Sequence, residues 1–232
     1  MTSPKSLATL AGVFYLLVAI FGYFALGYVD PKMYVARNAA ATAGNVVANA
    51  GLVRLGVVAH LLQSTFFVFL GLTLYELLQP VSKAIVRAML VLVALAAAID
   101  CLNTVFLFES LRVATDNTYT TAFGVAGSNA FVLLLLDTQH YGTLIAQVFF
   151  GLWLVPLGYL VYNSAGMFPK WLGVILIIAA VGYLVDVFVA FLLPELSPQI
   201  RIYAVAVPAS IAEVSMLAYL LIVGGKTGKQ TE

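Results

Sequence analysis

The stretch AIVRAMLVLVALAAAIDCLNTVFLFESL, from Ala84 to Leu111, decides the fold class of this chain. Its only charged residues are Arg87, Asp100 and Glu109. A helix of about 20 apolar residues crosses the hydrocarbon core of a bilayer. A strand of a membrane barrel would alternate polar and apolar residues, and residues such as Ala88–Ile99 do not. The stretch therefore predicts a membrane-spanning α-helix.

The composition of the whole chain agrees with this interpretation. Of 232 residues, 63% are hydrophobic and 9% are charged, and the mean hydropathy is +1.05. A soluble domain carries about 25% charged residues, so a soluble enzyme, a secreted disulfide scaffold and a disordered chain are excluded. The net charge of +1 provides no basic surface for nucleic acid. A single cysteine, Cys101, excludes an intrachain disulfide and a cysteine-based metal cluster. We expect an integral membrane protein whose partner is the lipid bilayer.

Further apolar runs extend the pattern to an all-α fold with six transmembrane helices in one domain, residues 1–232. The predicted spans are 7–29, 51–78, 84–111, 141–162, 171–193 and 202–223. The first run is longer than the apolar part of a signal peptide and lacks a clean cleavage site, so we interpret it as a retained helix.

Two longer segments, 30–50 and 112–140, are predicted to lie on the outer side. Asp30-Pro31 has the sequence of a helix start, with Asp30 as the N-cap and proline at the first helical position. Ser128–Asp137 is apolar but too short to span, which favours a position in the interface or a dip into the bundle.

The basic residues predict that both termini lie inside the cell. With that orientation, the short inner loops and tails contain Lys5, Lys83, Arg87, Lys170, Lys226 and Lys229. The outer side contains Lys32, Arg37, Arg54, Arg112 and Arg201. The inner side has only one basic residue more than the outer side. The inner basic residues lie in short loops and tails, however, where the positive-inside rule has most force.

Spans 2–3 and 4–5 resemble each other and suggest a parallel repeat. Gln63 precedes Tyr75 by the same interval as Gln147 precedes Tyr159. A lysine-containing inner turn follows in each, and the next span carries one acid, Asp100 or Asp186. If the repeat is real, these two acids face each other across an axis along the membrane normal. The alternative is a likeness of composition alone.

Polar side chains at membrane depth indicate where a functional site lies, because each needs a partner or a water-filled cavity. At 1.5 Å per residue they lie about 9 to 18 Å from the outer ends of five spans. We predict an outward-facing pocket lined by His60, Gln63, Asp100, Asn103, Gln147, Asp186 and Glu213. Its mouth would contain Asn45, Asn49, Arg54 and His140. The alternative for each residue is a structural role, such as a hydrogen bond between helices.

Three functions remain open from these residues. The acids and His60 could relay protons or hold a small molecule or lipid. An intramembrane enzyme could use the same carboxylates for acid–base work, or bind a metal through His60, Asp100, Asp186 and Glu213. A structural or accessory subunit would use the polar layer only for helix packing. The sequence identifies no cofactor, and it leaves open whether the chain forms a homo-oligomer.

Several motifs carry a family resemblance. They include Asn45-x-x-x-Asn49 followed by Arg54-x-Gly56, and Phe150-Gly-Leu-Trp153-Leu-x-Pro156. Together with the late Glu213, this pattern resembles the bacterial multi-pass family known as domain of unknown function 4386, from about Leu7 to Gly225. The resemblance implies a six-helix protein of the bacterial inner membrane without an established activity. His60, Asp100 and His140 do not match a family motif, so the resemblance does not support a family-wide metal site.

Overall fold

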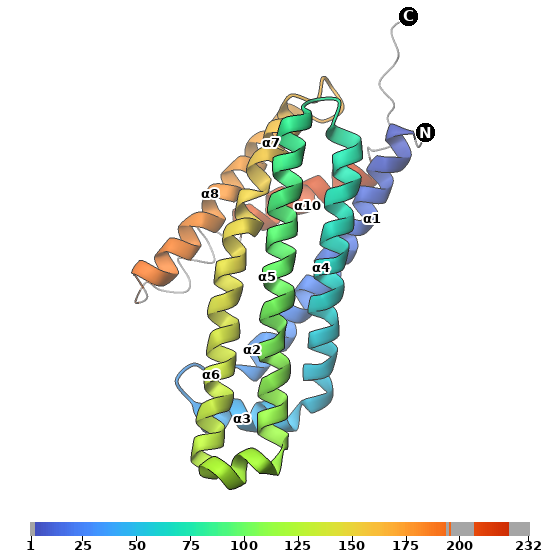
Figure 1. Cartoon of the computed structure of the whole chain (residues 1–232). Helices are drawn as coiled ribbons and strands as arrows, with labels where there is room; N and C mark the ends of the chain where they lie inside the picture. Colours follow the sequence, from blue (N-terminus) through green and yellow to red (C-terminus); the bar gives the residue numbers. More distant parts are fainter. Residues whose placement is uncertain (1–2, 194, 196–206, 223–232) are drawn as a thin grey trace, which may run out of the picture. The chain divides into compact units, whose positions relative to one another are not determined.

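The computed structural model describes residues 3–193, 195 and 207–222. In these residues the chain forms helices joined by turns, with no strand, and Figure 1 shows the order of the elements. The helices are α1 (Pro4–Gly22), η1 (Tyr23–Val29, a π-helix), α2 (Asp30–Met33), α3 (Ala39–Ala48), α4 (Ala50–Leu78), α5 (Lys83–Thr115), α6 (Asn117–Leu152), α7 (Leu154–Tyr162), α8 (Lys170–Leu192) and α10 (Val207–Ile222).

Five helical stretches among the described residues are long and apolar enough to cross a membrane. They are Pro4–Met33, Ala50–Leu78, Lys83–Thr115, Asn117–Tyr162 and Lys170–Leu192. These stretches contain the first four predicted spans and all of the fifth except its last residue, and the prediction of an apolar, multi-pass helical protein is confirmed. The sixth predicted span is described only as the shorter apolar helix α10. Residues 202–206 and 223 of that span lie outside the described residues.

The contacts divide the chain into two compact units. Unit 1 contains Met1–Leu16, Phe66–Ala97 and Ile145–Glu232, and unit 2 contains Leu17–Thr65 and Ala98–Leu144. Each unit is assembled from stretches that are separated in the sequence, so no single cut in the chain would release either one. The prediction of one transmembrane domain stays a prediction.

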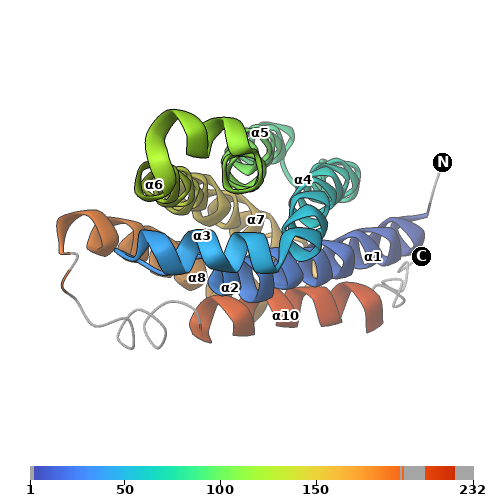
Figure 2. The same ribbon diagram turned by 90° about the horizontal axis from the view of Figure 1, so that it is seen from below.

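Unit 2 is built around an apolar core between η1, α2 and the parts of α3 to α6 that belong to it. The fully buried residues of this core include Val29, Met33, Val46, Val53, Leu107, Val132 and Leu136. Helix α3 lies crosswise to α4 and α5 in this unit, as Figures 1 and 2 show. η1 approaches α4 closely, because a Cβ atom on Gly56 would lie 2.7 Å from Cγ1 of Val29. This contact places the residue after Val29 beside α4.

The chain turns sharply between α2 and α3. Tyr34 leaves the helix with an extended backbone, and Arg37 adopts a φ of 61°. Asn38 then caps α3, since its side chain accepts a 3.0 Å hydrogen bond from the backbone N–H of Ala41. The predicted cap at Asp30 is wrong, because the backbone is already helical at Val29 and Asp30.

Residues 112–140 were expected to form an outer segment between two spans, but helices α5 and α6 continue through most of them. α5 continues to Thr115, and α6 begins at Asn117 after Asp116, whose carboxylate accepts a 2.8 Å hydrogen bond from the N–H of Thr118. The helix bends at Gly124, where φ is 69° and ψ is 169°. Ser128–Asp137 is therefore not a separate segment but part of the helix that leads into the predicted fourth span.

Unit 1 packs α7 and α8 as a tight antiparallel hairpin, with α10 beside α8. The two helices meet at glycines: a Cβ atom on Gly173 would lie 2.5 Å from the carbonyl oxygen of Gly158. The break between α6 and α7 lies at Trp153. Pro156 has no N–H to bond to the carbonyl of Leu152, which explains why the helix is interrupted there.

Candidate functional site

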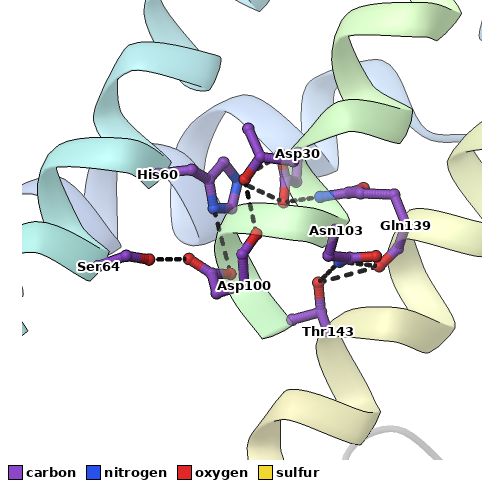
Figure 3. A network of polar contacts seen from close by, with 8 residues as sticks. Asp30, His60, Ser64, Asp100, Asn103, Gln139 and Thr143 are labelled. Carbon is purple, nitrogen blue, oxygen red and sulfur yellow. Dashed lines mark hydrogen bonds and ion pairs between the residues drawn. The ribbon is translucent and has the colours of Figure 1, made fainter. Parts of the chain in front are cut away.

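The candidate site in unit 2 is an imidazole held between two carboxylates (Figure 3). Nε2 of His60 lies 3.3 Å from Oδ2 of Asp30 and 3.4 Å from Oδ1. Nδ1 of the same ring lies 3.6 Å from Oδ1 of Asp100. The side chains of His60, Asp100 and Asp30 are 1%, 2% and 17% exposed, respectively. We call these three residues the Asp–His–Asp centre.

Each member comes from a different helical stretch that is long enough to cross a membrane. His60 lies on α4 and Asp100 on α5, while Asp30 is the first residue after the π-helix η1. A π-helix makes i→i+5 hydrogen bonds, so each of its residues advances less around the axis than in an α-helix. Seven π-helical residues therefore change the face on which Asp30 emerges. In Figure 3 its carboxylate points toward the ring of His60.

Neighbouring side chains orient both carboxylates. The hydroxyl of Ser64 donates a 2.7 Å hydrogen bond to Oδ2 of Asp100. The amide of Gln139 donates a 2.8 Å hydrogen bond to Oδ2 of Asp30. Asp100 thus has one oxygen bound by a neutral donor and the other near the imidazole. In Asp30, the oxygen that accepts from Gln139 also lies near the imidazole, and so does the second oxygen. This arrangement fixes the two acids on opposite sides of one ring.

Asn103 extends the network toward α6. Its side-chain amide donates hydrogen bonds to the carbonyl oxygen of Gln139 at 2.7 Å and to the hydroxyl of Thr143 at 3.0 Å. Gly142 allows this approach, because a Cβ atom there would collide with the Asn103 amide. The bonds hold the backbone of Gln139 in place, so Asn103 supports the residue that orients Asp30.

Two buried atoms of α4 have no hydrogen-bond partner within the described structure: Nδ1 of His60 and Oε1 of Gln63. The contact from Nδ1 of His60 to Asp100 is longer than a hydrogen bond. Gln63 lies one turn further along α4 and packs against Gly22, where a Cβ atom would lie 3.2 Å from the amide carbon. Unpaired polar atoms inside a protein are rare and often mark a functional site.

The charges of the Asp–His–Asp centre do not balance. Two carboxylates and a protonated imidazole sum to −1, and a neutral imidazole leaves −2. The basic side chains of unit 2 are all exposed: Lys32, Arg37, Arg54 and Arg112. A net charge within a membrane-spanning bundle is costly. Binding of a proton would reduce this negative charge.

The remaining predicted lining residues lie in unit 1 and form two further contacts. The amide of Gln147 donates to Oδ2 of Asp186 at 2.9 Å and to the carbonyl of Tyr183 at 3.3 Å. Glu213 accepts hydrogen bonds from the hydroxyls of Tyr15, at 3.1 Å, and Tyr183, at 2.6 Å. That all seven predicted residues line one pocket stays a prediction.

The predicted mouth residues make local contacts. The amide of Asn49 donates to the carbonyl of Asn45 within the same turn. Arg54 is exposed. The ring of His140 stacks on Tyr34, with centroids 5.3 Å apart. Tyr34 itself donates a hydrogen bond to Asp137, and burial together with this bond raises the pKa of the phenol well above its usual value.

Among the described residues, no group of three or more histidine, cysteine or acidic side chains is arranged to hold a metal ion. The four residues predicted as alternative metal ligands are divided between the units: His60 and Asp100 in unit 2, Asp186 and Glu213 in unit 1.

The partners that sequence reasoning missed include Asp30, Gln139 and Tyr15. Asp30 was expected at a helix cap, and its place depends on a π-helix that composition does not reveal. Gln139 lies in a segment expected outside the spans. Of the three tyrosines in the first apolar run, Tyr15 lies farthest from the ends of the run, and a phenol at that depth is a signal that could have identified it.

Apolar helices of membrane-crossing length define the class: this is a helical, multi-pass membrane protein, and it carries a buried carboxylate–imidazole centre. The chain belongs to the family described as domain of unknown function (DUF4386), which matches residues 10–224. The resemblance found from the motifs is thereby confirmed.

A relative in Archaeoglobus fulgidus, described as an uncharacterized protein, is 33% identical over 124 residues. The match covers 53% of this chain and 60% of the relative, so the chain spans less than two thirds of that protein's length. No solved structure matches the chain.

Proposed function

We propose that the protein is a proton-coupled membrane protein. In this proposal the Asp–His–Asp centre takes up and releases a proton while the bundle binds or transports a small molecule or lipid. The observation that carries the proposal is the His60 ring between the carboxylates of Asp30 and Asp100, each from a different helical stretch. Ionisable groups inside membrane-spanning helices commonly form proton relays.

The chemistry of imidazole suits a relay. Its two ring nitrogens can bind and release protons at opposite edges, and here each edge faces a different aspartate. Asp30 is 17% exposed and Asp100 is 2% exposed. A proton would therefore enter at Asp30, pass to Nε2 of His60 and leave from Nδ1 to Asp100.

Ser64 donates its hydroxyl hydrogen bond to Asp100 and not to the ring of His60. The serine–histidine pair that activates a nucleophilic serine in many hydrolases is therefore not formed here. Acid–base catalysis by the same carboxylates is the alternative in the enzyme class, and a purely structural role for the polar residues is the third alternative.

The membrane setting is part of the proposal. We place the chain in the bacterial plasma membrane with six spans and both termini inside, which puts Asp30 at the outer end of the first span. The support is the distribution of basic residues in short loops. The suggested repeat of spans 2–3 and 4–5 also belongs to the proposal. Its support is that each acid accepts a hydrogen bond from the first span of its own hairpin: Asp100 from Ser64, and Asp186 from Gln147.

A pH jump on proteoliposomes tests the proposal without a known substrate. Vesicles adsorbed on a solid-supported membrane report the charge that moves when the protein binds protons. We expect a transient current with the full chain and a clearly smaller one with H60Q. The matched control is D116N, because Asp116 is an exposed titratable residue of the same unit that accepts a hydrogen bond from the backbone of Thr118. Equal currents from H60Q and the unmodified protein would contradict the proposal.

A further inference from the structure

Glu213 is the centre of a second, partly buried polar cluster, in unit 1. It lies on α10, and each of its carboxylate oxygens is bound by a different helix. Oε2 accepts a hydrogen bond from the Tyr15 hydroxyl of α1, and Oε1 accepts one from the Tyr183 hydroxyl of α8. We call these residues the Tyr–Glu–Tyr centre.

Packing holds both phenols in position. Tyr15 is 3% exposed, and its ring contacts the edge of Trp153 with centroids 6.1 Å apart. Tyr183 packs on α6 at Gly151, where a Cβ atom would lie 2.7 Å from the Tyr183 Cβ. The hydroxyls therefore cannot move far from Glu213 without repacking their helices.

No basic side chain of the described part of unit 1 balances Glu213. Lys5, Lys83, Arg87 and Lys170 are all exposed. The titratable groups of the neighbouring helices are Tyr15 on α1, with Tyr183 and Asp186 on α8. Asp186 is itself an acid, bound by Gln147 of α6. An ionised Glu213 thus depends on two neutral donors, which stabilise a carboxylate less than a cation would.

We infer that Glu213 is a second proton-binding site of this chain, distinct from the Asp–His–Asp centre. The carboxylate takes one proton from hydronium and releases one water, and no other bond changes. A phenol hydroxyl both donates and accepts hydrogen bonds. When ionised, Glu213 accepts from both tyrosines. When protonated, it donates to one phenol oxygen after that hydroxyl turns.

The protonation state of Glu213 changes how strongly α10 is held to α1 and α8. The ionised carboxylate accepts charge-assisted hydrogen bonds from α1 and from α8, and such bonds are about twice as strong as neutral ones. Protonation leaves only neutral hydrogen bonds. Proton uptake at Glu213 therefore weakens the attachment of α10 to α1 and α8.

Infrared difference spectroscopy tests this inference on the full chain in lipid nanodiscs, with the proton as the probe. A pH titration reports the C=O stretch of each carboxylic acid that becomes protonated. We expect one buried-acid band that disappears in E213Q. The matched control is E76Q, because Glu76 is an exposed glutamate of the same unit, and that variant should keep the band. A titration of E213Q that is identical to the unmodified protein would overturn the inference.

A second variant covers the case in which E213Q does not fold. The double variant Y15F/Y183F keeps the acid and removes both donors. It should shift the frequency and the midpoint of the Glu213 band, and an unchanged band would overturn the inference. In H60Q the band should remain, so failure of the Asp–His–Asp proposal and failure of this inference give different spectra.

Discussion

The side-chain amide of Gln139 donates a 2.8 Å hydrogen bond to the carboxylate of Asp30, a residue 109 positions earlier in the chain. Gln139 is 4% exposed, and its own carbonyl is held by Asn103 and Thr143. The bond therefore connects the end of the first apolar stretch to α6, and its donor is shielded from water. The orientation of Asp30 toward His60 depends on it.

Replacing Gln139 should destabilise unit 2. In Q139A the partly buried carboxylate of Asp30 loses this donor, which costs about 1–3 kcal/mol. Thermal unfolding in detergent, followed by the loss of helical signal, measures the change. The control is T138A, because Thr138 is exposed and its hydroxyl bonds only within its own helix. A Q139A protein as stable as T138A would show that the bond does not contribute.

Gly56 should tolerate no side chain, whereas Gly51 on the same helix should. A Cβ atom on Gly56 would lie 2.7 Å from Val29, and one on Gly51 would meet nothing within 4 Å. G56A therefore pushes η1 from α4, at a cost of about 1–3 kcal/mol. G51A should stay within about 1 kcal/mol of the unmodified protein. Chemical denaturation of both variants distinguishes the two, and equal stabilities would contradict the close packing of η1.

Nitrogen NMR of histidine-labelled protein should separate the two histidines. The chain contains two, so H140Q leaves the ring signals of His60 alone. Loss of the Asp100 carboxylate, 3.6 Å from Nδ1, should change the nitrogen chemical shifts of the His60 ring in D100N. D116N should leave these shifts in place, since Asp116 is exposed and bonds to Thr118. Identical ring shifts in D100N and D116N would argue against contact between Asp100 and the ring.

The phenol of Tyr34 should make stability depend on alkaline pH. Burial and the hydrogen bond to Asp137 raise its pKa in the folded state above the unfolded value. Its contribution is therefore complete below the ordinary pKa of tyrosine and is lost as the pH rises through the folded-state pKa. The stability difference between the unmodified protein and Y34F should be constant near neutral pH and shrink only at strongly alkaline pH. Thermal unfolding across that range measures it, and a difference that shrinks already below the ordinary pKa would contradict the assignment.

The class of fold follows from composition because a chain with 9% charged residues has too few polar groups for a water-facing surface. The length of each apolar run then gives the positions of the membrane-spanning helices. The distance of each polar residue from the outer end of its span places His60 and Asp100 in the same layer. These predictions need only the apolar pattern and the rise of a helix.

The rest depends on local backbone geometry that the apolar pattern does not contain. The π-helix before Asp30 changes the side of the helix from which this residue projects. A prediction that assumes a regular helix therefore assigns Asp30 to a helix cap. Ser128–Asp137 looks isolated because polar residues follow it, yet α6 continues through them. The pairing of Tyr15 with Glu213 joins residues near opposite ends of the chain. The position of each residue within its own helix does not show which residue of the other helix it faces.

The pair Tyr15 and Glu213 also has a consequence for biosynthesis. Their side chains are 198 residues apart in sequence, whereas the partners of Asp30 and His60 have all been synthesised once α6 has reached Gln139. A chain made from its N-terminus can therefore complete the Asp–His–Asp centre while the ribosome is still translating α7 to α10. The first helix must wait in the bilayer, with its phenol unpaired by Glu213, until nearly the whole chain has been inserted.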